Sequence, residues 1–162
     1  MTDSNKLATL ITRYELVEVT IPATTVVGQV NLPPSVQNLQ NTPERKIFIK
    51  DIEVFPIYAQ AASVKNSGLA GLPVAEIPKI SLSVYYDNGI FIRYIPIAKL
   101  IYTVPPANIN SPYQHERVAF DMLYPVAIDQ CFLQFNTAPA TLPYVIPIGF
   151  TYTYYPVVKQ AA

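Results

Sequence analysis

The stretch from residue 79 to residue 100 reads KISLSVYYDNGIFIRYIPIAKL. Every second residue of its first part is apolar, namely Ile80, Leu82, Val84 and Tyr86. This period of two is typical of a strand with one buried face. Asn88-Gly89 follows, and it is the strongest short-range signal for a hairpin because both residues accept positive φ. The returning segment, residues 90–97, is apolar on both faces except at Arg93, so we expect it deep in a sheet or in an assembly. The stretch therefore predicts a β-hairpin at the centre of an all-β domain.

Alternation of the same kind continues on both sides of the hairpin. It predicts further strands at residues 14–21, 24–30, 45–58, 99–104, 116–124, 130–136 and 144–155. In the first of these Leu16 is expected to point inward, with Val17 and Val19 as further inward candidates. In the third, Ile47 and Ile49 share one face while Ile52 and Val54 share the other, and a slip of one position near Lys50-Asp51 is what a β-bulge would produce.

Residues 59–78 carry the only helical character, and we read them as a long loop with one helical turn near residues 60–65. The chain therefore has eight or nine strands, negligible helix and no βαβ alternation. This predicts an all-β fold, a two-sheet antiparallel sandwich, with a single jelly roll as the best match. An immunoglobulin-like sandwich comes second, because its Cys…Trp…Cys signature is absent. A length of 162 residues fits one domain. We expect a polar N-terminal tail over residues 1–12 and a single domain over residues 13–162.

The chain carries few charges for its size. Charged residues make up 14% of it and the net charge is zero, whereas about 25% is usual for soluble domains. Such a surface gives a free monomer little colloidal protection. We therefore expect much of the surface to be buried against other subunits. The alternative is a monomer whose surface is rich in Thr, Asn and Gln.

No constellation of residues indicates catalysis, a cofactor or a metal. His115 is the only histidine, and nothing fixes it in a triad with Ser111 or Glu116. Cys131 alternates with Leu133 and Phe135, as a buried core thiol would, and one His with one Cys cannot build a zinc site. Asp87-Asn88-Gly89 lacks the further spaced acids of a calcium loop. We predict no enzyme activity and no catalytic, cofactor-binding or metal site.

Two uncharged spans, residues 19–43 and 130–158, are interrupted by prolines and do not predict a transmembrane helix. The polar N-terminus has no signal-peptide core, so synthesis in a cytosol is expected, and an outer-membrane barrel would need such a signal. Arg45-Lys46 is a pair and not a basic patch, so contact with nucleic acid is not expected.

The twelve tyrosines are the most suggestive feature of the composition. Tyrosine offers a large contact area and one polar group, which suits protein interfaces and also sugar stacking. About half of them are expected to be sheet-forming core residues instead. The interface candidates are Tyr58, Tyr85, Tyr102, Tyr113 and Tyr155.

The chain resembles the small jelly-roll coat proteins of icosahedral viruses, including the single jelly-roll shell and vertex proteins of tailless bacteriophages. The resemblance covers the whole chain at the level of pattern: size, polar tail, strand number, uncharged Pro-rich loops and a Tyr-rich final strand. It implies a virion structural subunit without catalysis, made in the host cytoplasm. Its partners would be copies of itself and other virion proteins, contacted through loops 31–44, 59–78 and 105–115. The missing basic arm departs from coat proteins that wrap their genome, and favours a vertex or minor shell role.

The alternative hypothesis is a carbohydrate-binding or receptor-binding β-sandwich, such as a lectin-like or fibre-tip module. It is motivated by the tyrosines and by the Asn- and Gln-rich loops, and it predicts a concave face with exposed aromatic residues. A β-sandwich enzyme is a third possibility, for which no acid–base pair stands out.

Overall fold

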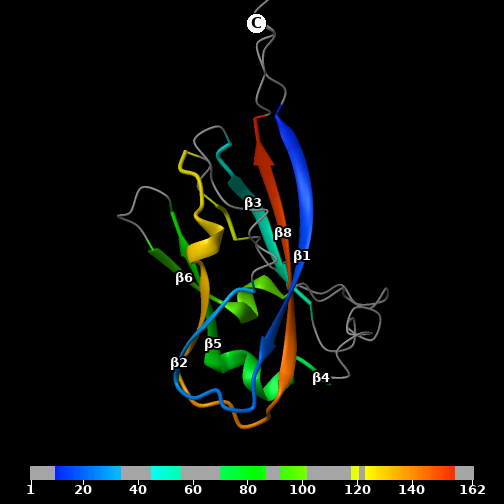
Figure 1. Ribbon diagram of the computed structural model, residues 1–162, viewed down its shortest axis with the longest axis vertical. Helices are drawn as coiled ribbons and strands as arrows, with labels where there is room; N and C mark the ends of the chain where they lie inside the picture. Colours follow the sequence, from blue (N-terminus) through cyan, green and yellow to red (C-terminus); the bar gives the residue numbers. More distant parts are fainter. Residues whose placement is uncertain are drawn as a thin grey trace, which may run out of the picture.

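A computed structural model describes residues 10–33, 45–55, 70–86, 92–101, 118–120 and 123–155. Within these residues the chain is mostly β, with short 3-10 helices and no α-helix, so the predicted all-β class is confirmed (Figure 1). The strands are β1 (Ile11–Ile21), β2 (Gly28–Asn31), β3 (Phe48–Val54), β4 (Ala70–Gly71), β5 (Ile80–Tyr85), β6 (Ile92–Pro96), β7 (Phe132–Phe135) and β8 (Tyr144–Tyr154). The 3-10 helices are η3 (Val74–Lys79), η4 (Ile97–Leu100) and η5 (Ile128–Gln130).

The strands form two antiparallel sheets. The first has the order β1-β8-β3, and the short β4 joins β8 in parallel. The second has the order β2-β7-β5-β6. The central strand of the first sheet is β8, which pairs with β1 without interruption from Ile11↔Tyr154 to Ile21↔Tyr144. The two sheets lie side by side, with β1, β8 and β3 on the right of the view and β2, β5 and β6 on the left (Figure 1).

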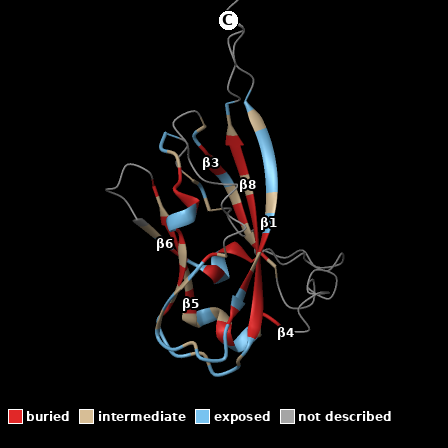
Figure 2. Cartoon of the chain, in the orientation of Figure 1, coloured by how far each residue is buried: buried red, intermediate tan, exposed pale blue. Residues whose placement is uncertain are grey.

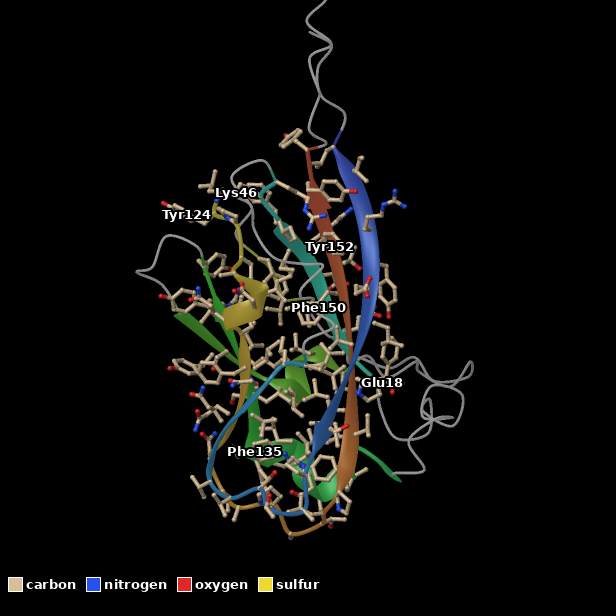
Figure 3. The ribbon with its side chains drawn as sticks, viewed as in Figure 1. Glu18, Lys46, Tyr124, Phe135, Phe150 and Tyr152 are labelled. Carbon is tan, nitrogen blue, oxygen red and sulfur yellow. The ribbon has the colours of Figure 1, made fainter. Side chains whose placement is uncertain are left out.

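One hydrophobic cluster takes residues from both sheets. From β8 it receives Tyr144, Ile146, Ile148, Phe150 and Tyr152, the alternating face that the sequence predicts. The second sheet contributes Leu82, Leu133 and Phe135, each fully buried. Figure 2 shows β8 buried along most of its length, and Figure 3 shows Phe135 and Phe150 in the space between the two sheets. Each such side chain stabilises the fold by about 1.5–3 kcal/mol.

The predicted β-bulge in β3 is confirmed. The register with β8 shifts between Ile49 and Asp51. The slip places Ile47, Ile49, Ile52 and Val54 together in the core, each no more than 1% exposed. The ladder to β8 ends just beyond Val54, where Phe55 N–H donates to the carbonyl of Pro147. Since proline has no N–H, it cannot return a hydrogen bond on that side.

The two strands of the predicted hairpin, and their antiparallel pairing, are confirmed. β5 pairs antiparallel with β6 from Ser81↔Pro96 to Tyr85↔Ile92, the register that a two-residue turn at Asn88-Gly89 would give. The turn itself lies outside the described residues, as do the 60–65 segment and the first nine residues of the expected tail. The division into a tail and a single domain stays a prediction.

Three expectations about strands are wrong. Leu16 is 41% exposed while Val17 and Val19 are buried, because neighbours in a strand face opposite sides and only one of Leu16 and Val17 can face inward. The predicted strand at residues 99–104 is wrong at its start, because η4 extends to Leu100 and buries Ile97 and Leu100 on one side of a 3-10 turn. Residues 102–104 lie outside the described residues. The structure places residues 118–120 and 123–124 in no strand, although Val118 and Phe120 pack against the core.

The first residues of two further strands also differ from expectation. β1 begins at Ile11, three residues before the predicted start, and β2 begins at Gly28 instead of Thr24. A turn at residues 23–24 occupies the beginning of that second predicted strand, and Thr25 N–H donates to the carbonyl of Pro22 at 3.0 Å.

Candidate interaction surface

The structure describes two of the predicted interface tyrosines. Tyr155 follows β8 directly and is 54% exposed. Tyr85 ends β5 and is half-buried against the core. Tyr58, Tyr102 and Tyr113 lie outside the described residues. The assignment of these five to an interface therefore stays a prediction.

Tyrosine exposure varies widely along the described chain. The buried tyrosines are Tyr86, Tyr144 and Tyr152, the half-buried ones are Tyr85 and Tyr154, and the exposed ones are Tyr14, Tyr94, Tyr124 and Tyr155. Sequence reasoning missed Tyr14 because it placed Leu16, which shares a face of β1 with Tyr14, toward the core. The alternation of Val17, Val19 and Ile21 was the signal that could have found it.

Apolar side chains form an exposed stripe on the outer face of β1, made of Leu10, Tyr14 and Leu16. They are 41%, 51% and 41% exposed. Figure 3 shows Glu18, the next residue on this face, on the side of β1 away from the second sheet. The outer β1 stripe is therefore a candidate contact surface, because adjacent exposed apolar side chains of this size favour association with a partner.

Gly149 makes room for the ring of Tyr14. A Cβ placed on Gly149 would lie 2.9 Å from Cε2 and Cζ of that ring, which is closer than carbon atoms pack. The Tyr14 ring thus crosses the central strand toward β3, where Glu53 pairs with Gly149. Partial burial, and then the charge of Glu53, raise the pKa of Tyr14 above its ordinary value. The ring is held across the sheet and is not a free side chain.

Arginines and tyrosines gather on the opposite face of the same sheet. The rings of Tyr152 and Tyr154 stack with centroids 6.1 Å apart, and the guanidinium carbon of Arg45 lies 5.6 Å from the Tyr154 centroid. Arg13 and Glu15 project from β1 on this face. Burial and then the charge of Glu15 raise the pKa of Tyr152, while Arg45 and Arg13 act in the opposite direction. This face therefore presents both signs of charge beside an aromatic pair (Figure 3).

A buried carboxylate ties η3 to the chain ahead of β8. Glu76 is fully buried, and its Oε1 accepts hydrogen bonds from Lys79 Nζ at 3.0 Å and from the Ala140 N–H at 3.1 Å. Its Oε2 and the Tyr144 hydroxyl are buried without a hydrogen-bond partner among the described residues. Burial and then the charge of Glu76 raise the pKa of Tyr144. These contacts are internal and hold the fold together.

Cys131 is a buried core thiol, as its alternation with Leu133 predicts. Its Sγ accepts the Tyr85 N–H and donates to the Ala127 carbonyl, both at 3.4 Å. Burial raises the pKa of this thiol to about 12. Since the thiolate is the reactive form, Cys131 is not suited to act as a nucleophile.

Among the described residues, no three His, Cys, Asp or Glu side chains stand close enough to hold a metal ion. In the same part of the chain, no helix has the length and apolar character to cross a membrane.

Comparison of the chain with protein-family models, with curated proteins and with solved structures gave no match.

Proposed function

We propose that the protein is a virion structural subunit with the single jelly-roll fold, acting through protein–protein interfaces. It would take part in a shell, a vertex or a minor capsid position, in contact with copies of itself and with other virion proteins, and it would be made in the host cytoplasm. The observation that carries the proposal is the order of the strands in the two sheets.

A jelly roll arises when one long antiparallel hairpin of eight strands wraps into two sheets. Along the hairpin the first strand pairs with the eighth, the second with the seventh, the third with the sixth and the fourth with the fifth. Wrapping then adds the third strand to the eighth and the fourth to the seventh. With the two-residue β4 set aside, β1, β2, β3, β5, β6, β7 and β8 take every place in this scheme except the sixth.

The observed pairs fit that scheme. β1–β8, β2–β7 and β5–β6 are three of its four hairpin ladders. β3–β8 and β5–β7 are the two pairs that wrapping adds. An immunoglobulin-like sandwich would keep its first two strands in one sheet, whereas β1 and β2 belong to different sheets.

The sixth strand of the scheme belongs beside β3, on the side away from β8. Residues 118–120 have the right place in the chain for it, but they form no strand in the structure. Val118 and Ala119 line a cavity of about 460 Å³ together with Lys50, Asp51 and Glu53 of β3.

Jelly rolls build viral capsids and also lectins and cupins, so the fold alone does not choose among these functions. The low charge and the exposed apolar stripe on β1 favour assembly. The carbohydrate-binding alternative predicts exposed aromatic residues on one concave face. Of the exposed tyrosines, Tyr14 lies on the first sheet and Tyr94 on the second, which gives that alternative less support.

The test is the solution mass of the purified full-length chain, measured by light scattering over a concentration series and followed by electron microscopy of the assembled fractions. We expect a discrete trimer, pentamer or larger closed shell. A monomer at every concentration that binds defined glycans on an array would overturn the proposal in favour of the carbohydrate-binding module.

A further inference from the structure

The edges of the two sheets are protected to different degrees. Sheet edges invite pairing with other chains, and natural proteins block this with bulges, prolines, charged side chains or short strands. β3 carries a bulge and Lys50, β6 contains Arg93 and ends in Pro96, and β2 has only four residues. β1 has eleven residues, no proline and a continuous register, and its charged residues, Arg13, Glu15 and Glu18, carry both signs. Among the described residues, no strand pairs with its outer edge.

The backbone groups that β1 offers at this edge can be assigned. The carbonyl of Pro147 accepts from Phe55, so the backbone polar groups of Pro147 face β3. In an antiparallel ladder both groups of a residue point the same way and the direction alternates along the strand. Glu18, the partner of Pro147 on β1, is therefore at a non-hydrogen-bonded position of that ladder. Its N–H and C=O point to the outer edge, and by alternation so do those of Tyr14 and Leu16.

The charges of β1 favour one register for pairing with a second copy. In a two-fold antiparallel pair, a pairing centred on Arg13 or on Glu15 would place like charges opposite each other, which is destabilising. Centred on Tyr14, the pair places Arg13 of each copy opposite Glu15 of the other, and Thr12 opposite Leu16. Arg13 and Glu15 then occupy a non-hydrogen-bonded pair, in which side chains are closest. The Tyr14 residues of the two copies exchange both backbone hydrogen bonds.

We propose that β1 is a two-fold contact between copies of this chain, formed by antiparallel pairing of the two β1 strands about Tyr14. The contact joins the first sheets of the two copies into one sheet. It places the two Tyr14 residues opposite each other on the outer face and sets two Arg13–Glu15 pairs on the opposite face. It deepens the proposed function, on which it rests, by naming one contact through which the subunits assemble.

Cross-linking tests the register directly. Opposite hydrogen-bonded residues have Cα atoms about 5.5 Å apart, within the range of a disulfide. Tyr14→Cys in the full chain should therefore give a covalent dimer on mild oxidation. Leu16→Cys is the matched control: it lies on the same face with similar exposure. In the proposed register Leu16 faces Thr12 of the other copy, and the Leu16 of that copy lies four residues further along the strand, roughly 14 Å away. Position 16 should therefore not cross-link. The buried Cys131 does not interfere.

Charge reversal tests the pairing in solution. Arg13→Glu and Glu15→Arg should each weaken dimerisation at least tenfold in sedimentation equilibrium. The double variant Arg13→Glu/Glu15→Arg, which restores opposite charges across the two-fold, should return it to within threefold of the native chain. Lys99→Glu, exposed on η4, should have no effect. Circular dichroism checks that each variant is folded, and the cysteine pair remains decisive if a reversal variant is not.

The outcomes separate the two proposals. Larger assemblies without a Tyr14→Cys cross-link, or an equal cross-link at position 16, overturn the β1 contact and leave the capsid role standing. A β1 dimer that never builds a larger closed assembly overturns the capsid role and leaves the β1 contact standing.

Discussion

Replacing Lys79 by methionine should destabilise the protein far more than the same substitution at an exposed lysine. Lys79 Nζ lies 3.0 Å from Oε1 of Glu76, whose side chain is fully buried while that of Lys79 is 22% exposed. Methionine keeps the apolar stem and removes the ammonium. The Glu76 carboxylate would then stay buried with only the Ala140 N–H as a donor.

The expected cost is about 3 kcal/mol. Removing one partner of a buried ion pair costs about 3–5 kcal/mol because the other charge is left uncompensated. The lower end applies here, since Lys79 is partly exposed and Ala140 still donates. Glu76→Gln should cost less than about 1 kcal/mol, because its amide oxygen still accepts both hydrogen bonds and Lys79 can turn its charge to water. In the Glu76→Gln background, Lys79→Met should also cost less than about 1 kcal/mol, which gives a coupling of about 2 kcal/mol.

Urea unfolding followed by circular dichroism measures all four chains of this double-mutant cycle. Lys99→Met on the exposed side of η4 is the matched control and should stay within about 0.5 kcal/mol of the native chain. If Lys79→Met costs no more than Lys99→Met, or costs the same with and without Glu76→Gln, the buried carboxylate does not depend on Lys79 and the reasoning fails.

Three further predictions concern the core and the central strand. Phe135→Ala should cost about 3–5 kcal/mol in urea unfolding through the cavity it leaves, whereas Val74→Ala, at a side chain 72% exposed, should change little. Gly149→Ala should cost about 1–2 kcal/mol because its methyl group displaces the Tyr14 ring, and equal losses with and without Tyr14→Ala would contradict this. Burial raises the pKa of Cys131 from 9.0 to about 12, so the unfolded chain loses this proton first and stability should fall as pH rises above 9. The loss between pH 9 and 10 is about 1 kcal/mol, and a Cys131→Ala chain with the same slope there would refute it.

The alternation of apolar and polar residues was enough to predict the presence of most of the strands. In β8 and β5 the residues of the hydrophobic cluster are those that a period of two selects, because a strand that packs one face on a core must place every second side chain inward. The central position of these strands also buries Val145, Thr153 and Ser83 on the other face, which alternation does not predict. The bulge at Lys50-Asp51 could be predicted from alternation as well: the apolar residues change parity there while one face stays buried. The burial of the Cys131 thiol could be predicted from the same alternation.

Alternation failed where two adjacent residues were both apolar. Leu16 and Val17 offer equal hydrophobicity, and which of them faced inward depended on the continuous pairing of β1 with β8. The same ambiguity hid the exposed stripe of Leu10, Tyr14 and Leu16. Residues 97–100 form η4 because Ile97 and Leu100, three positions apart, are both buried, which requires a turn and not an extended strand.

The sequence by itself determined the all-β class, the strands of the central hairpin and the bulge, because these depend on local periodicity and on residue types. Only the tertiary structure decided the order of the strands. Pairing between β1 and β8 joins the two ends of the chain, and no local pattern specifies a partner so distant. The same long-range pairing turned Tyr14 onto Gly149 and left the outer edge of β1 without a partner strand among the described residues. The candidate contact surface is therefore a product of the fold, since it exists only once β8 has taken the centre of its sheet.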